Sequence, residues 1–126
     1  MENDGAAAII VTSVERARDL KPTPAVVLAA AQGSTARNQA PAHNADIYAT
    51  SNFQHVGKRL YEIAGVTPND VDVSQVYENF TGGVMMSIVE HGLCSADEVN
   101  DIFTLENFKS TGKLPINTSG GNLAEC

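Results

Sequence analysis

Short apolar stretches alternate along this chain with segments whose apolar positions recur at helical spacing. The apolar stretches predict strands at residues 5–12, 25–31, 71–76 and 114–118. Residues 25–31 are apolar throughout, which is typical of a strand that is buried on both faces. Because helical segments separate the strands, the pattern predicts a layered α/β fold with much parallel pairing.

The longest predicted helix has recognisable start and stop residues. Asn52 is a suitable N-cap, residues 53–64 carry apolar side chains at helical spacing, and Gly65 is a natural stop. A second helix is predicted to begin at the cap residue Thr81 and to end before Gly92. The predicted strand at residues 71–76 lies between these two helices in the sequence.

Shorter elements complete the pattern. Residues 14–20 predict a short helix, and the spacing of Ser95 and Glu98 matches the capping box that opens another. Residues 32–51 have no periodicity, so this loop either lines a functional site or is a surface excursion. We expect three residues near the C-terminal end to cover an apolar pocket: Phe103, Leu105 and Phe108.

Composition narrows the class of protein. The chain has 126 residues, enough for one domain, and its hydrophobic content of 43% suffices for a core. A net charge of −7 disfavours nucleic acid as a partner, because phosphates attract clusters of Lys and Arg. We expect a cytoplasmic protein, since no membrane span or secretory signal pattern is visible. Cys94 and Cys126 lack metal-ligand spacing, so we predict reduced thiols and no metal site.

Two polar segments at predicted strand ends are the strongest candidates for chemistry. Residues 76–83, Val-Tyr-Glu-Asn-Phe-Thr-Gly-Gly, place a phenol, a carboxylate and an amide where a strand gives way to a helix. Residues 115–125, Pro-Ile-Asn-Thr-Ser-Gly-Gly-Asn-Leu-Ala-Glu, contain a turn whose N–H groups can approach an anion or a thioester oxygen. Taken alone, the first segment favours a structural interpretation, in which Tyr77 closes the strand and Thr81 caps the helix, and the glycines could serve an ordinary tight turn.

Together these segments resemble the C-terminal half of a thiolase-superfamily protein. Residues 3–11, Asn-Asp-Gly-Ala-Ala-Ala-Ile-Ile-Val, resemble the strand that completes the N-terminal half. Tyr-Glu-Asn-Phe-Thr-Gly and Asn-Thr-Ser-Gly-Gly-Asn-Leu-Ala-Glu are similar to the sterol-carrier-protein-x or lipid-transfer branch, and within it to thiolase-like retro-aldolases of steroid side-chain degradation. Condensing or thiolytic members have Asn or His at the place of Tyr77, so this residue favours aldol chemistry over thiolysis.

The resemblance implies a fold and a division of the chain. We expect the C-terminal half of a thiolase-like fold, with a layered, mixed and mostly parallel sheet and flanking helices. Residues 1–20 would form the last strand and helix of the N-terminal half, and residues 21–126 the C-terminal domain. In the family, Ala-Glu-Cys is followed by an aromatic-x-His-Gly segment. The fold is therefore expected to be incomplete at its C-terminal end, and the fragment alone to be inactive.

The resemblance also implies an activity and its residues. A lyase is expected that cleaves a β-hydroxyacyl-CoA, with a steroid side-chain thioester as substrate, by retro-aldol chemistry. Tyr77 is the candidate catalytic residue, because a phenol can transfer protons if its surroundings lower its pKa from about 10. The candidate substrate-binding residues are Asn79, Ser119, Gly120 and Gly121. Side chains alternate along a strand, so Glu78 is expected on the face opposite to that of Tyr77, where it would make a structural ion pair or hydrogen bond.

Partners and alternatives follow from the same resemblance. The reaction is expected to need no cofactor, since CoA enters as part of the acyl-CoA substrate. A homodimer is expected, together with a small acyl-CoA-associated partner of OB-fold and zinc-ribbon type. Two other functions stay open: a lipid-transfer-type 3-ketoacyl-CoA thiolase, which is an acyltransferase, and a non-catalytic interaction module.

Overall fold

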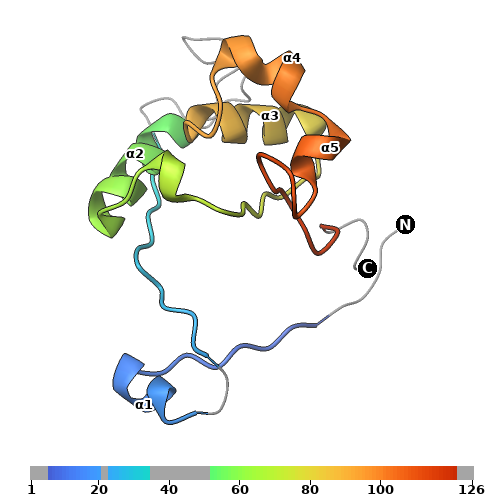
Figure 1. Ribbon diagram of the computed structural model, residues 1–126. Coiled ribbons are helices and arrows are strands. Elements are labelled where there is room, and N and C mark those ends of the chain that lie inside the picture. The colour runs from blue at the N-terminus through green and yellow to red at the C-terminus, as the bar shows by residue number, and fades with distance from the viewer. Residues whose placement is uncertain (1–5, 21–22, 35–51, 122–126) are drawn as a thin grey trace.

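The computed structural model of the chain describes residues 6–20, 23–34 and 52–121 (Figure 1). The loop predicted at residues 32–51 and the thiol of Cys126 therefore lie largely or wholly outside the described residues. The regular elements of the described part are helical. In chain order they are α1 (Val14–Arg18), α2 (Phe53–Ala64), η2 (Pro68–Asp70), α3 (Thr81–Glu90), η3 (Ala96–Glu98), α4 (Val99–Ile102) and α5 (Leu105–Phe108).

Helix α2 confirms the predicted helix at residues 53–64 but begins differently from the prediction. Asn52 occupies the N-cap position, as predicted, but its backbone is left-handed, with φ of 65°, and its side chain makes no capping hydrogen bond. Instead, the Glu90 carboxylate at the end of α3 accepts a hydrogen bond of 3.3 Å from the Gln54 N–H. An acidic group near a helix N-terminus is favourable, and here a neighbouring helix supplies it. Gly65 ends α2 with φ of 69°, as predicted.

The short elements follow their local signatures. Helix α1 confirms the start of the predicted helix at residues 14–20, and its N-cap is Ser13, whose hydroxyl accepts from the Arg16 N–H at 3.3 Å. The capping box of Ser95 and Glu98 is present at η3, with both reciprocal hydrogen bonds formed. Thr81 is the first helical residue of α3 rather than its cap. These elements arise from interactions within four residues, so the sequence pattern suffices to locate them.

The core lies between α3 and the segment that follows α5. Ile88 is fully buried, and Leu114 and Ile116 pack with it. The rings of Phe103 and Phe108 meet edge to face at 5.2 Å. Partly buried apolar side chains surround this centre: Val76, Val84, Leu93, Cys94, Ile102, Phe103 and Phe108. The core therefore joins the residues before and within α3 to the C-terminal segment.

The predicted strands are realised only in part. Segments 71–76 and 114–118 lie side by side, and Ser74 and Ile116 form a parallel bridge, which is the strand pairing seen within the described residues. Residues 6–12 and 25–31 make no ladder with any described segment. The burial on both faces predicted for residues 25–31 is not provided by the described residues, where Val27 is 80% exposed. In Figure 1 the blue residues 6–20, with α1, lie apart from α2–α5, and the cyan residues 23–34 lead from there toward α2. A strand requires a partner and a covering layer, and no described residue supplies either here.

Candidate active site

Two chain segments form the framework of the site. The Ser74 N–H donates to the Pro115 carbonyl at 2.9 Å, and the Asn117 N–H donates to the Ser74 carbonyl at 2.9 Å. This is the hydrogen-bond pattern of a parallel pair, in which one residue bonds to both neighbours of its opposite. These hydrogen bonds hold the segment around Ser74, which leads to Tyr77, against the segment around Ile116, which leads to the glycine turn.

The Asn117 side chain continues this connection. Its Oδ1 accepts from the Val76 N–H at 2.7 Å, and its Nδ2 donates to the Val76 carbonyl at 2.8 Å and to Glu78 Oε2 at 3.3 Å. The backbone of Asn117 has φ of 46°, in the left-handed region that Asn tolerates better than most residues. The carboxamide thus bonds to the residues on both sides of Tyr77.

The turn after Asn117 passes close to the Glu78 carboxylate. The Gly120 N–H donates to the Asn117 carbonyl at 2.8 Å, which closes the turn. Gly121 has φ of 71°, and a Cβ on this residue would lie 2.9 Å from Glu78 Cδ. Glycine at position 121 therefore satisfies both the backbone conformation and the approach of the carboxylate.

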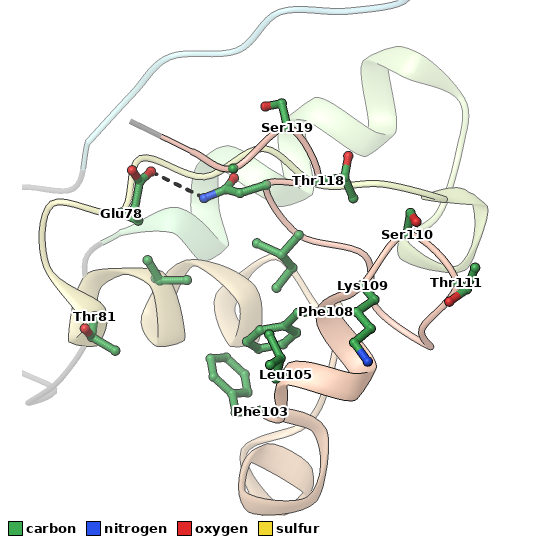
Figure 2. A pocket seen from close by; sticks show the side chains of 14 residues that line it. Glu78, Thr81, Phe103, Leu105, Phe108, Lys109, Ser110, Thr111, Thr118 and Ser119 are labelled. Atoms are coloured by element: carbon green, nitrogen blue, oxygen red, sulfur yellow. Dashed lines mark hydrogen bonds between the residues drawn. The ribbon is translucent and has the colours of Figure 1, made fainter. Parts of the chain in front are cut away.

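An open pocket of about 780 Å³ lies beside these segments (Figure 2). The two framework segments contribute polar groups to it from Glu78, Ser119 and Gly120. The first turn of α3 contributes Thr81. Its other residues include the aromatic pair of the core and the turn after α5. The full lining is Glu78, Thr81, Val84, Phe103, Leu105, Phe108, Lys109, Ser110, Thr111, Ile116, Asn117, Thr118, Ser119 and Gly120.

Charges of both signs lie at the pocket. The apolar residues Phe103, Leu105 and Phe108 form one wall of the pocket, which we call the apolar wall. Beside this wall, Lys109 Nζ pairs with Glu106 Oε2 at 2.6 Å. Because Thr81 opens the ten-residue helix α3, the positive end of that helix borders the pocket near Glu78. A pocket with an apolar wall, a helix N-terminus and turn N–H groups suits an acyl chain that carries a polar, partly anionic end.

Other reactive groups lie outside this pocket. Burial and the nearby Glu98 carboxylate raise the pKa of the Cys94 thiol, so the thiolate is disfavoured.

No group of three or more His, Cys, Asp or Glu side chains is placed to hold a metal ion within the described ranges. The described helices are likewise too short or too polar to cross a membrane.

Comparison with known proteins gives the family. Residues 31–126 match the family described as "Thiolase C-terminal domain-like". The chain belongs to the thiolase C-terminal domain family. Over 99% of its length it is 38% identical to the 17-hydroxy-3-oxo-4-pregnene-20-carboxyl-CoA lyase of Mycobacterium tuberculosis and covers 33% of that protein. Over 99% of its length it is also 36% identical to the steroid side-chain-cleaving aldolase of Thermomonospora curvata, of which it covers 32%.

A solved structure supports the same family. The structure named "Ltp2-ChsH2(DUF35) aldolase" matches 87% of this chain and 29% of its own, with a TM-score of 0.76 and 35% sequence identity. This confirms a thiolase-like fold and the resemblance found in the sequence. The chain spans about a third of the length of the curated relatives it matches.

Within this thiolase C-terminal domain, the predicted site residues fall into two groups. Ser119 and Gly120 line the pocket, and Gly121 lies against the Glu78 carboxylate. Tyr77 is 65% exposed, and Tyr77 and Asn79 are not part of the pocket lining. Their site roles stay predictions, as does the division of the chain at residue 20.

Two further residues of the domain were not predicted as site residues. Glu78 makes the hydrogen bond expected of it, but it also lines the pocket. Asn117 belongs to the motif at residues 115–125, and the signal in the sequence is its place shortly before the glycine pair, where Asn can adopt a left-handed backbone. The apolar residues Phe103, Leu105 and Phe108 do line the pocket, as the sequence predicted.

Proposed function

We propose that the protein carrying this chain is a thiolase-like aldolase, a carbon–carbon lyase that cleaves a β-hydroxyacyl-CoA. The observation that carries the proposal is the pocket, where the segment that bears Tyr77 and Glu78 and the turn at residues 118–120 meet an apolar wall. The names of the two relatives support a CoA thioester of a steroid side chain as the substrate class.

The chemistry is a retro-aldol cleavage. A base takes the proton of the β-hydroxyl group, a carbonyl forms on Cβ, and the bond between Cα and Cβ breaks. The electron pair of that bond passes into the thioester as an enolate, which then takes a proton at Cα. The thioester carbonyl itself accepts the electrons, so the proposed reaction uses no metal or organic cofactor.

Named residues take the roles in this proposal. Tyr77 transfers a proton, and Asn79, which lies two residues further along the chain and is also exposed, orients the substrate. Backbone N–H groups of Ser119 and Gly121 stabilise the enolate oxygen, where negative charge develops. The N–H of Gly120 bonds to the Asn117 carbonyl, so Gly120 contributes to substrate binding as a residue of the pocket lining. The apolar wall, with Phe103 among its residues, receives the carbon skeleton of the acyl group.

The assembly is also proposed. We infer a homodimer that works with a small acyl-CoA-associated partner of OB-fold and zinc-ribbon type; the name of the structural relative, which has two components, supports such a partner. Residues 6–12 and 25–31 would pair within the mixed, mostly parallel sheet of the complete fold. The exposure of Ile10 (89%) and Val27 (80%) supports this, because apolar strands are normally covered. A cytoplasmic location is part of the same proposal.

The test is an assay of the full-length protein with its partner. A steroid β-hydroxyacyl-CoA is incubated with the protein, and mass spectrometry follows the release of a ketone and a shorter acyl-CoA in equal amounts. A 3-ketoacyl-CoA with free CoA is the parallel assay for thiolysis, the activity suggested by the acetyl-CoA acetyltransferase of Methanothermobacter thermautotrophicus, which is 29% identical to the chain. Thiolysis without aldol cleavage would replace the proposal with the thiolase alternative. No turnover of either substrate would favour an interaction module.

A further inference from the structure

The carboxamide of Asn117 stands where the next peptide group of the parallel pair would stand. Beyond the bridge of Ser74 and Ile116, a regular ladder would join the N–H and carbonyl of Val76 to backbone groups of the opposite segment. Here both Val76 groups bond to the Asn117 side chain, at 2.7 and 2.8 Å. The side chain therefore supplies the acceptor and the donor that the carbonyl of residue 117 and the N–H of residue 119 would supply in a continued ladder.

This replacement frees the backbone to turn. The Asn117 carbonyl accepts from the Gly120 N–H at 2.8 Å, which it could not do in the same way if the strand continued. With φ of 46°, the chain leaves the strand direction at this residue and enters the turn at residues 118–121. One residue therefore ends the strand, starts the turn and still holds the opposite segment.

The same side chain reaches the carboxylate at the pocket. Asn117 Nδ2 lies 3.3 Å from Glu78 Oε2, so its hydrogen bonds to Val76 and to Glu78 bracket Tyr77 on both sides. An amide is required for this set, because it accepts one hydrogen bond and donates two, whereas a carboxylate donates none. The hydrogen bonds restrict the backbone before Tyr77 and the side chain after it.

We propose that Asn117 is the positioning residue of the active site: it holds Tyr77 in register with the Ser119–Gly121 turn and orients the Glu78 carboxylate. The proposal rests on the proposed aldolase function, with Tyr77 as the proton-transferring group. A small displacement of such a group lowers the rate of the chemical step more than it weakens binding.

The test compares two matched substitutions in the full-length protein with its partner. Asn117→Asp keeps the size of the side chain and an acceptor for the Val76 N–H but removes both donated hydrogen bonds. Asn107→Asp is the control, because Asn107 Nδ2 also donates to two carbonyls, those of Asp101 and Ile102, at 3.0 and 3.1 Å. We expect Asn117→Asp to lower kcat by roughly 10- to 100-fold with KM changed by less than about threefold, and Asn107→Asp to leave kcat near that of the parent.

A rescue separates positioning from folding. In Asn117→Asp combined with Glu78→Gln, the new amide at position 78 can donate to the new carboxylate, so kcat should recover by about threefold or more over Asn117→Asp alone. Amide hydrogen exchange of the peptide that contains Val76 should be faster in Asn117→Asp and in Asn117→Gly, which retains the left-handed backbone, but not in Asn107→Asp.

Three outcomes overturn the proposal in distinguishable ways. If the parent cleaves substrate and Asn117→Asp keeps its kcat, the positioning role is wrong and the aldolase function stands. If kcat falls but the Glu78→Gln combination gives no recovery and hydrogen exchange is unchanged, Asn117 does not act through these hydrogen bonds. If the parent protein shows no aldol cleavage, the proposed function fails and this role fails with it.

Discussion

The ring of His91 lies directly against Gly57, where α3 ends beside the middle of α2. A Cβ on Gly57 would stand 2.9 Å from His91 Cδ2, closer than such atoms normally approach. The ring is held in place because His91 Nδ1 donates to the Ser87 carbonyl at 2.7 Å. Phe53 also contacts the ring, with centroids 5.6 Å apart. The absence of a side chain at position 57 thus lets α2 pack on the helix whose other end borders the pocket.

Gly57→Ala should therefore destabilise the protein. Alanine is favoured over glycine within a helix by about 1 kcal/mol, but the methyl group must displace the His91 ring and its hydrogen bond. We expect a net loss of about 1 kcal/mol in the free energy of unfolding, measured by chemical denaturation. Gly83→Ala in α3 is the control, since a Cβ there meets no atom within 4 Å, and it should be neutral or stabilising. Equal stability of the two variants would contradict this packing argument.

Tyr77→Phe should abolish most cleavage in the full-length protein while binding is nearly unchanged. The substitution keeps the ring and removes only the proton-transferring hydroxyl, so kcat should fall on the order of 10²–10⁴-fold. The control is Tyr61→Phe on α2, which removes a hydroxyl whose partial burial raises its pKa and which lies outside the pocket. Steady-state kinetics distinguish the two, and a Tyr77→Phe enzyme with kcat within a few-fold of the parent would refute the assigned role.

Gly121→Ala should harm the protein more than Gly65→Ala. Both glycines have left-handed backbones, with φ of 71° and 69°, so both substitutions incur a backbone cost of about 1–2 kcal/mol. Only at position 121 would the new Cβ also meet the Glu78 carboxylate, since nothing lies within 4 Å at position 65. The comparison of melting temperatures and kcat isolates this contact. Adding Glu78→Ala should restore part of the stability lost in Gly121→Ala, and no such recovery would argue against the contact.

Acidification should remove the stabilising contribution of the Glu98 capping box. Hydrogen bonds from the Ser95 hydroxyl and N–H, at 2.7 and 3.0 Å, hold the pKa of Glu98 below its ordinary value of 4.5. Because the folded pKa is the lower one, the contribution is complete above pH 4.5 and is lost as the pH falls through the folded value.

Glu98→Gln should accordingly show a smaller drop in Tm than the parent when the pH is lowered from about 5 to about 3. Ser95→Ala should flatten the profile in the same direction, because it removes the donor that lowers the pKa most. Combining the two substitutions should add little. A parent and a Glu98→Gln variant with parallel profiles would show that this carboxylate contributes nothing to the acid response.

The residues of the pocket illustrate both sides of prediction from sequence. The sequence predicted that the apolar side chains of Phe103, Leu105 and Phe108 cover a pocket, and the structure places all three in its lining. Asn117 gave no comparable signal, because its role depends on Val76, a residue 41 positions away. Glu78 was expected on the face opposite Tyr77, but strand alternation does not say what that face meets.

Local interactions are what the sequence by itself determined. The capping box of Ser95 and Glu98, the stop at Gly65 and the helical spacing of residues 53–64 operate within a few residues, so the pattern predicts them directly. The motifs also identified the thiolase family, which the match over residues 31–126 confirmed.

Tertiary structure alone decided the remaining features. Glu90, and not the N-cap residue Asn52, supplies the side-chain hydrogen bond at the start of α2, since a carboxylate 36 residues from Gln54 comes close only when α2 and α3 pack together. Residues 25–31, whose apolar pattern predicted burial, are largely exposed because no described segment covers them. Burial and long-range hydrogen bonds depend on which segments become neighbours in space. Hydrophobic periodicity identifies the apolar face of an element, but it does not identify the segment that packs against that face.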